Sequence, residues 1–443
     1  MSIFCSIECV VCFGFSRWAW KRCTYIGNYD SETWSTADSD DFSEVPHICR
    51  LILAVYEEDL CNPRSPPIPH GYRLNPDYVV RRVTYKDTNG NCPPYIIYAD
   101  PEVKEVVVAL RGLNLAKESD YKLLLNNKLG MQKFDGGYAH YGLLKSAVWL
   151  LEKESDTIQG LVREMGAECK VIFAGHSLGS GVAALVTVLA VNHRDKVGGI
   201  PRTHIRGYAI APARCMSLKL AVKYADVIHS VVLQDDFLPR TATPLEDIFK
   251  SIFCLPCLLF FVCMRDTFVP EGKKLGDPRR LYAPGRIYHI VERKFCRCGR
   301  YPPIVRTAIP VEGRFEHIVL SSNATKDHAI IWIERESEKA LVRMKKKSET
   351  LTPPSAQKMV RMQTLKQEHK EAIERAMSLN VPHTEGLQDE CNVDDQEEEE
   401  EVEEGGMEMK PNAKLRWDVL VSSLFEQGET GQVLLKNQSN LVD

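Results

Sequence analysis

A short apolar run that ends in a serine between two glycines constrains the fold of this chain more than any other feature. Val171–Ala174 (Val-Ile-Phe-Ala) leads directly into Gly175–Gly179 (Gly-His-Ser-Leu-Gly), and the small, helix-forming residues Val182–Leu185 follow. β-branched and aromatic residues indicate a buried strand, and small residues indicate a helix. Strand, sharp turn and helix, with serine at the apex, are the parts of a nucleophile elbow.

Ser177 is the predicted nucleophile of this elbow. The turn would project its hydroxyl at the N-terminus of the following helix, where the backbone amide of Leu178 is free to bind an oxyanion. The glycines on either side would allow the strand and the helix to approach closely. The pattern therefore indicates acyl-transfer chemistry.

The length of 443 residues exceeds one typical core, so we expect one large catalytic domain with appendages. The expected parts are a Cys- and Trp-rich interfacial segment at 1–30, an α/β domain at 31–345, a charged low-complexity linker at 346–414, and a short amphipathic helix with a tail at 415–443. We expect the charged C-terminal region to be largely disordered. The net charge is only −4, and no basic patch is interleaved with aromatic residues, which argues against a nucleic-acid partner.

The 15 cysteines do not form the pattern of a disulfide framework. Their number is odd, and the first residues lack the basic start of a secretory signal, which favours a reducing, cytoplasmic environment. The pairs Cys254/Cys257 and Cys296/Cys298 are too far from a second matched pair to predict a zinc site, and buried thiols are the simpler interpretation. No metal and no cofactor are expected.

Two apolar stretches are too short to span a bilayer but have an interfacial composition. Residues 3–20 combine aromatic side chains with three cysteines, Cys5, Cys9 and Cys12, and basic residues follow. Such a segment would lie on a membrane as a peripheral contact, and its thiols would be open to S-acylation; the alternative is a helix packed on the core. Residues 252–264 would form either a buried strand or a lid over an acyl pocket.

The rest of the catalytic domain alternates between strand and helix patterns. Strands are expected at Val106–Leu110, His204–Ile210, Val227–Leu233 and Arg286–Val291, and helices at Tyr141–Met165 and Met216–Tyr224. This alternation predicts the α/β class, with a mostly parallel central sheet and helices on both faces. Ligands would then bind at the carboxyl ends of the strands.

The two partners of Ser177 should follow it in the chain at strand ends. Val231–Leu233 is an apolar strand end followed by Asp235 and Asp236, and we favour Asp236 as the acid with Asp235 in reserve. His328 lies in a loop before an amphipathic stretch, so we favour it as the base. His317 is the alternative, and His289 lies within a strand pattern that indicates the core. His328 would take the proton of Ser177, and Asp236 would hold the imidazole in place.

Several of these segments together resemble the class 3 lipases, most closely the diacylglycerol lipase branch. The segments are Gly175–Gly179, Val107–Gly112 and Asp236–Arg240. Longer runs resemble a plant group of these lipases that is described as calmodulin-binding heat-shock proteins, and these are Arg17–Cys23, Ala211–Cys215 and Phe295–Arg300. The resemblance covers about residues 17–345.

This resemblance implies an α/β-hydrolase fold with Ser177 as nucleophile, Asp236 as acid and His328 as base. It also implies an oxyanion loop at the Arg-Gly turn, with the amide of Leu113 as the second donor beside Leu178. Family members usually carry threonine or serine at this position, so Leu113 lacks a hydroxyl donor, a loss that costs roughly a hundredfold in turnover. The implied substrate is an ester of a long acyl chain of the diacylglycerol or triacylglycerol class, with phospholipid and galactolipid also open. Asn114–Phe134 would be a charged cover of the site.

The C-terminal region suggests a competing function. Residues 335–365 have the basic charge of a calmodulin target, and residues 415–427 have apolar anchors at helical spacing. The alternative to the lipase is therefore a catalytically weak, calmodulin-binding regulatory or scaffold protein on a hydrolase fold. A soluble esterase or thioesterase is a third interpretation.

Overall fold

A computed structural model describes most of the expected α/β domain and parts of both ends of the chain. The described residues are 3–67, 71–114, 116–126, 132–241, 269–293, 300–348, 355–383, 425–427 and 433–435. The apolar stretch 252–264 and the cysteine pairs Cys254/Cys257 and Cys296/Cys298 lie outside these ranges.

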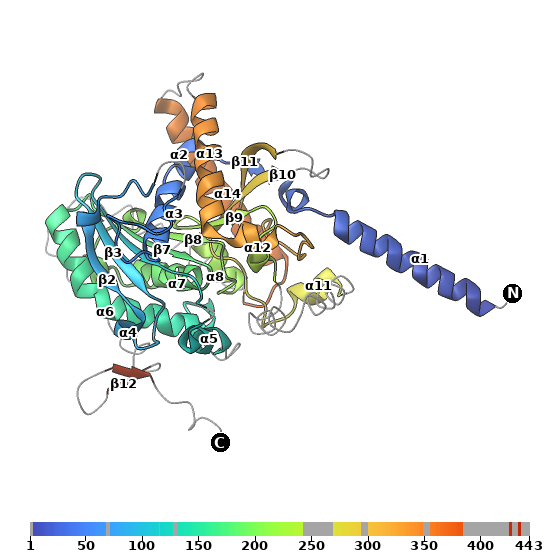
Figure 1. Cartoon of the computed structure of the whole chain (residues 1–443), viewed down its shortest axis with the longest axis horizontal. Helices are drawn as coiled ribbons and strands as arrows, with labels where there is room; N and C mark the ends of the chain where they lie inside the picture. Colours follow the sequence, from blue (N-terminus) through green and yellow to red (C-terminus); the bar gives the residue numbers. More distant parts are fainter. Residues whose placement is uncertain are drawn as a thin grey trace.

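A nine-stranded sheet forms the centre of the molecule, in the spatial order β1-β11-β10-β9-β8-β7-β4-β3-β2 (Figure 1). The strands are β1 (Ser35–Thr36), β2 (Val79–Val83), β3 (Tyr95–Asp100), β4 (Glu105–Leu110), β7 (Lys170–His176), β8 (Ile205–Ile210), β9 (Ile228–Leu233), β10 (Arg286–Arg293) and β11 (Arg300–Ala308). The central run from β4 to β10 is parallel, and antiparallel strands complete both edges.

Helices cover both faces of this sheet. One face carries α6 (Tyr141–Met165), α7 (Leu178–Asn192) and α8 (Leu218–Lys223), and the other carries α3 (Val45–Ala54) and α13 (Ile330–Ser348). Successive residues of β4 alternate between the two cores, with Val106 and Val108 in the first and Val107 in the second. Burial on both faces explains why these strands are apolar throughout rather than at every second residue. The prediction of an α/β-hydrolase fold is confirmed.

The N-terminal helix α1 (Ile3–Thr24) projects away from the body of the molecule (Figure 1). Its aromatic side chains Phe13, Phe15 and Trp20 are exposed by 80%, 48% and 72%. The described part of α1 is therefore not packed on the core, which was the alternative left open by the sequence. Among the helices in the described ranges, none combines the length and the apolar character that a bilayer-spanning segment requires.

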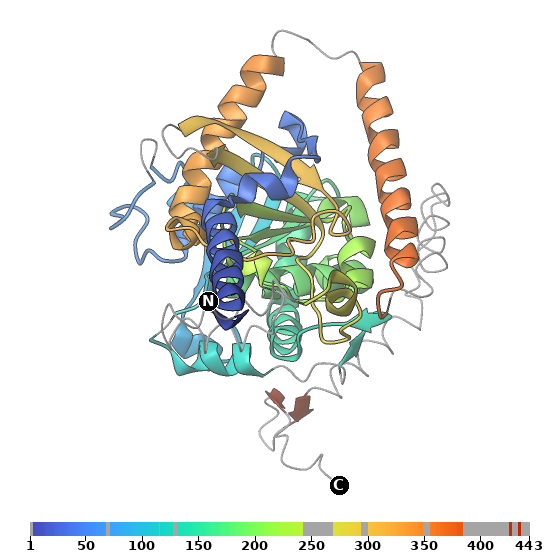
Figure 2. The same ribbon diagram turned by 90° about the vertical axis from the view of Figure 1, so that its right-hand side faces the viewer.

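The segment after the catalytic domain is not simply a linker. Helix α14 (Ser355–Ser378) stands opposite α13 in Figure 2, and its C-terminal half packs against α8. Ala372, Ile373 and Ala376 are buried there. The charged linker expected at 346–414 thus contains a helix, and one apolar helical turn in its charged sequence is sufficient to hold this helix on the body of the molecule.

The prediction of a helix over residues 415–427 is wrong for the last three of them. Phe425–Gln427 form strand β12, which pairs antiparallel with β13 (Val433–Leu435), and residues 415–424 lie outside the described ranges. Val433–Leu435 supply an apolar partner strand, and backbone pairing with it prevails over the helical spacing of the preceding residues.

Candidate active site

The turn between β7 and α7 holds Ser177 in a strained conformation. Its backbone has φ 54° and ψ −116°, which residues with a side chain rarely adopt. A Cβ on Gly175 would lie 2.1 Å from the carbonyl oxygen of Gly179, and one on Gly179 would lie 2.4 Å from that of Arg111. Both positions therefore require glycine, as the sequence suggested.

Ser177, His328 and Asp236 are connected by hydrogen bonds. The Oγ of Ser177 lies 3.0 Å from Nε2 of His328, and Nδ1 of His328 lies 2.9 Å from Oδ1 of Asp236. Both distances lie within the range for proton transfer and for orientation of an imidazole. The Asp236 side chain is completely buried, and its Oδ1 also accepts a hydrogen bond from the amide of Leu238 at 3.0 Å. The carboxylate is thus fixed from two sides.

His176, the residue before Ser177, contacts the backbone of His328. Its Nε2 donates a hydrogen bond to the carbonyl oxygen of His328 at 2.8 Å. Burial lowers the pKa of His176 to about 3, so this imidazole stays neutral at physiological pH and keeps the donating proton on Nε2. The ring of Phe237 lies 4.9 Å from that of His328, centroid to centroid. His328, at the end of α12 (Ala324–His328), is therefore held by its backbone and by its ring.

The two reserve residues have other contacts. Asp235 accepts a hydrogen bond from the amide of Gly27 at 2.7 Å, and its other oxygen lies 3.2 Å from Arg293. The ring of His317 lies edge-on to Tyr25, with the centroids 6.2 Å apart. The structure thus brings Asp236 and His328 to Ser177 and places Asp235 and His317 in neighbouring clusters.

The sequence assigned the backbone amides of Leu113 and Leu178 to an oxyanion site. Leu178 is the first residue of α7, and Leu113 follows Gly112, where a Cβ would lie 2.7 Å from Nδ1 of His176. The amide of Gly112 itself donates to the hydroxyl of Tyr56 at 2.8 Å. Within the described part of the chain, the amides of Leu113 and Leu178 have no other acceptor. They remain available to a ligand.

The segment after Leu113 is anchored to the body of the molecule. In α5 (Glu118–Leu125), the side chain of Asp120 is buried, although the sequence predicted a charged cover. Asp120 accepts hydrogen bonds from the amide of Asn114 and from the hydroxyl of Tyr85, each at 2.8 Å. Burial raises the pKa of Asp120. Sequence patterns gave no signal for Asp120 or Tyr56, because their partners lie in distant or irregular segments.

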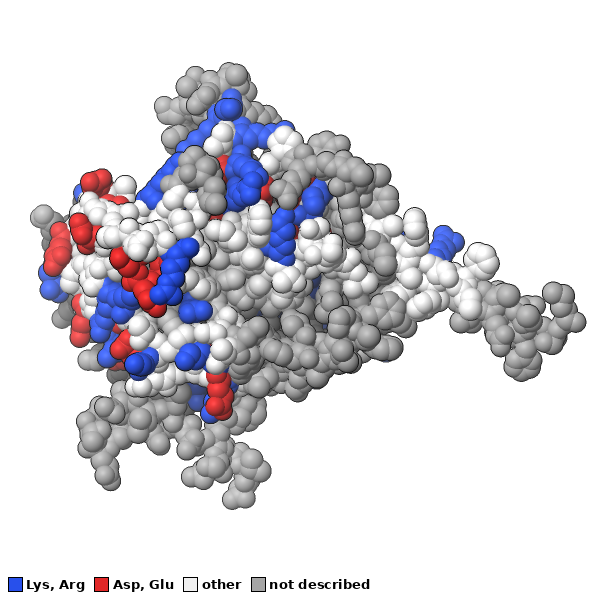
Figure 3. All heavy atoms as spheres, viewed as in Figure 1, with Lys and Arg blue, Asp and Glu red and all other residues white. Residues whose placement is uncertain are grey.

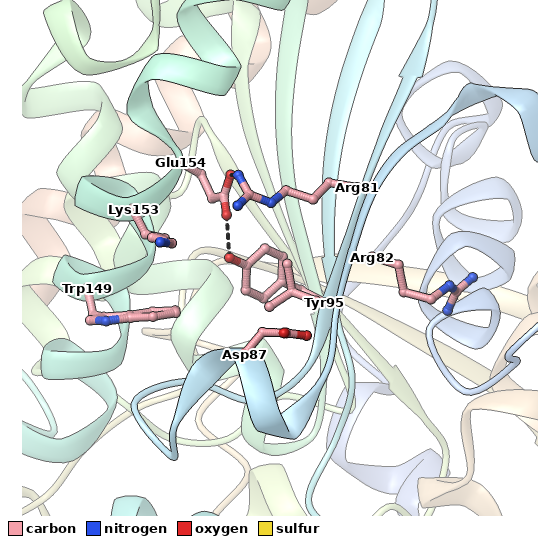
Figure 4. Close-up of a pocket in the computed structure, with 8 residues that line it drawn as sticks. Arg81, Arg82, Asp87, Tyr95, Trp149, Lys153 and Glu154 are labelled. Carbon is pink, nitrogen blue, oxygen red and sulfur yellow. Dashed lines mark hydrogen bonds and ion pairs between the residues drawn. The ribbon is translucent and has the colours of Figure 1, made fainter.

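A separate cavity of about 320 Å³ lies between β2, β3, α4 (Tyr85–Thr88) and α6 (Figure 4). Arg81 and Tyr95 both point toward the buried carboxylate of Glu154 and are bonded to it, while Arg82 points away. The residues that line this cavity are mostly charged, and Ser177, Asp236 and His328 are not among them. It does not suit an acyl chain. The described residues also contain no group of three or more His, Cys, Asp or Glu side chains that would hold a metal ion.

Comparisons with known proteins show which families this sequence is similar to. Residues 107–246 match the model of the class 3 lipases, and residues 6–74 match the lipase 3 N-terminal region. Diacylglycerol lipase-beta of Mus musculus is 29% identical over 170 residues, which cover 36% of this chain and 23% of the relative. Diacylglycerol lipase-alpha of Homo sapiens is 24% identical over 237 residues, which cover 45% of this chain and 22% of the relative. The chain thus spans less than a quarter of the length of these relatives.

Solved structures of fungal lipases are also similar. The triacylglyceride lipase of Rhizomucor miehei is 15% identical, with a TM-score of 0.41, and the match covers 66% of this chain and 90% of the lipase. A lipase of Rhizopus microsporus var. chinensis is 13% identical, with a TM-score of 0.43, and the match covers 66% and 88%. The two family matches show that residues 6–74 and 107–246 are similar to the class 3 lipases.

Proposed function

We propose that the chain is a serine ester hydrolase with Ser177 as nucleophile, His328 as general base and Asp236 as the orienting acid. The observation that carries the proposal is the line of hydrogen bonds from the Ser177 hydroxyl through His328 to the buried Asp236. His328 takes the proton as Ser177 attacks an ester carbonyl, and Asp236 stabilises the resulting imidazolium. The amides of Leu113 and Leu178 bind the oxyanion, and water then releases the acyl group from Ser177.

The proposed substrates are acylglycerols of the diacylglycerol or triacylglycerol class. This choice is supported by the match to the class 3 lipases and by two relatives that are named diacylglycerol lipases. The buried state of Asp236 and the nearly buried Ser177 also favour an ester that brings its own apolar surface into the site.

Hydrolysis of dispersed diacylglycerol tests this proposal. The wild-type protein should release fatty acid, and Ser177→Ala should lower turnover by about a millionfold, to background, because the nucleophile is lost. Its melting temperature should stay at the wild-type value, which separates loss of chemistry from loss of fold. Equal fatty-acid release by the wild type and Ser177→Ala would contradict the proposal.

We also propose that α1 contacts a lipid surface as a peripheral anchor. Large aromatic side chains on a helix are stabilised when protein or lipid covers them, and Phe13, Phe15 and Trp20 of α1 are exposed. Exposed Arg17 and Lys21 lie near the body end of α1 and would attract anionic headgroups. Surface-bound α1 would bring the enzyme to the phase that holds its substrate.

Vesicle flotation tests the role of α1. Burial of an aromatic side chain contributes about 1.5–3 kcal/mol, so Phe13→Ser with Trp20→Ser should weaken binding to anionic vesicles by at least about tenfold. Val103→Ser is the matched control, because Val103 is 59% exposed on the body of the molecule. Flotation of the double variant at the wild-type level would rule out α1 as the anchor.

A second candidate function is a calmodulin-binding scaffold with weak turnover. The N-terminal half of α14 exposes Met359, Val360 and Met362, with exposed fractions of 68%, 60% and 63%. The C-terminal end of α13 carries exposed basic residues, among them Arg343 and Lys345. This end lies beside the N-terminal end of α14 at the top of Figure 2, and Figure 3 shows positive side chains at the top of the molecule. Methionines beside basic residues suit the apolar grooves of calmodulin. Calcium-dependent binding of calmodulin by a protein that leaves diacylglycerol intact would favour this function.

A further inference from the structure

The guanidinium group of one arginine binds three buried carboxylates, two of which belong to neighbours of Asp236 and His328 in the chain. Arg293, the last residue of β10, lies 3.1 Å from Oδ1 of Asp327, 3.2 Å from Oδ2 of Asp235 and 2.6 Å from Oε1 of Glu292. It also bonds to Oδ2 of Asp327. The three carboxylate side chains are at most 2% exposed, and that of Arg293 is 11% exposed. The fork of the guanidinium can engage two carboxylates at once in a fixed geometry.

Two of these carboxylates belong to residues that are adjacent in sequence to the proposed acid and base. Asp235 directly precedes Asp236, and Asp327 directly precedes His328. The amide of Asp235 also donates to Oδ2 of Asp327 at 2.9 Å, so the two segments are bonded to each other as well as to Arg293. Asp236 and His328 are 92 residues apart in sequence, and this cluster joins the backbone segments that carry them.

We propose that Arg293 is a positioning residue that sets the relative placement of Asp236 and His328. This inference rests on the proposed function, in which these two residues act on Ser177. Arg293 touches neither the nucleophile nor a reacting atom in the described structure; it acts through the residue before each partner. A displacement of about 1 Å in such a pair costs on the order of a hundredfold in rate, so the precision of this contact bears directly on turnover.

The N-terminal segment reinforces the same contact. The amide of Gly27 donates to the Oδ1 of Asp235 at 2.7 Å, while Arg293 binds the other oxygen. Asp30, in the same turn (Gly27–Ser31), pairs with the buried Arg240. Arg240 ends the segment Asp235–Arg240, which carries Asp236 and is called the acid loop here. The acid loop is therefore held by charge from β10 on one side and by the N-terminal turn on the other.

The charges of the cluster make this contact sensitive to pH. Burial raises the pKa of Asp327 to about 6, and the hydrogen bond and charge of Arg293 keep it from rising further. Arg293 and Glu292 face the cluster from β10, Asp235 from the acid loop, and Arg240 from the 3-10 turn Leu238–Arg240. Loss of the guanidinium would let Asp327 take up a proton at a higher pH, and a protonated Asp327 binds its partners less strongly.

The test compares Arg293→Lys with Arg286→Lys. Lysine keeps the charge but loses the fork, so Arg293→Lys should lower kcat for diacylglycerol hydrolysis by roughly 30- to 100-fold with KM unchanged. The acid limb of its kcat–pH profile should move to higher pH. Arg286 lies on the same strand, is buried, and pairs with Glu368 of α14 at 3.2 Å, so Arg286→Lys should keep the wild-type kcat and acid limb.

The outcomes separate this inference from the proposed function. Wild-type protein without hydrolase activity would refute the proposed function, whatever the variants do. An active wild type with a folded Arg293→Lys of equal kcat and equal acid limb would refute the positioning role alone. If Arg293→Lys does not fold, Asp327→Asn, which keeps the shape of the side chain, should show the lowered kcat and lose the ionisation near pH 6; a wild-type profile in that variant would overturn the inference.

Discussion

The two halves of the proposed active site are positioned by different kinds of interaction. Ser177 is fixed by a short local segment, in which Gly175 and Gly179 allow backbone atoms to pack without a side chain between them. The residues before Asp236 and His328 are bound by the buried guanidinium of Arg293 from β10, and Asp235 is also bound by the amide of Gly27 in the N-terminal turn. The placement of Ser177 therefore depends on steric fit, whereas the placement of Asp236 and His328 depends on electrostatics and responds to pH.

This difference predicts different effects of substitutions on the two sides of the site. A side chain added at Gly175 or Gly179 should act through packing and should affect stability and activity together at every pH. A change on the acid–base side should leave a folded protein whose kcat and pH profile are altered. The Arg293 variants address the acid–base side, and Gly175→Ala addresses the packing of the turn that carries Ser177.

The largest expected effect is that of Gly175→Ala. Its Cβ would lie 2.1 Å from the carbonyl oxygen of Gly179, a backbone atom that cannot move without breaking the start of α7. We expect a loss of stability of more than about 4 kcal/mol and no hydrolysis, measured by urea unfolding and by fatty-acid release.

Gly160→Ala is the matched control for this prediction. Gly160 lies within α6, where a Cβ would meet no atom within 4 Å, so alanine should stabilise the protein by about 0.5–1 kcal/mol. A soluble, active Gly175→Ala variant would show that the turn tolerates a side chain at this position. It would contradict the claim that steric fit at Gly175 positions Ser177.

A smaller effect is expected at the oxyanion loop. Leu113 offers a backbone amide but no hydroxyl, so Leu113→Thr should add a donor and raise kcat by about tenfold or more. Leu113→Val has the same branched shape without the hydroxyl and should not show this gain. Initial rates on dispersed diacylglycerol measure both variants. Equal rates for the threonine and valine variants would mean that a side-chain donor at this position has no access to the oxyanion.

Much of the parallel core could be predicted from sequence, because its signal is local. The apolar runs of β4 and β7 and the amphipathic spacing of α6 follow from burial on known faces. The elbow is the extreme case, since glycine, serine and glycine at fixed spacing specify its geometry. The candidate acid and base could be narrowed to Asp235 or Asp236, and to His328 or His317, because strand ends and chain order limit the choices.

The supporting contacts could not be predicted in the same way. Arg293 has the sequence context of an ordinary strand end, and its partner Asp327 is the 34th residue after it, so only the folded chain brings the two together. Tyr56 reaches the amide of Gly112 over a separation of 56 residues. The docking of α14 depends on one buried turn around Ala372 and Ala376, which the charged residues around it obscure.

The central claim is that Ser177, activated through His328 and Asp236, is the nucleophile, and the most direct test is the site and rate of covalent labelling by a fluorophosphonate. Peptide mass spectrometry of the labelled wild type should locate the adduct on Ser177, with no adduct in Ser177→Ala. Asp236→Asn should be folded and should label about 10⁴-fold more slowly, because the imidazole loses the correct tautomer. An adduct on another serine, or a wild-type labelling rate in Asp236→Asn, would contradict the account.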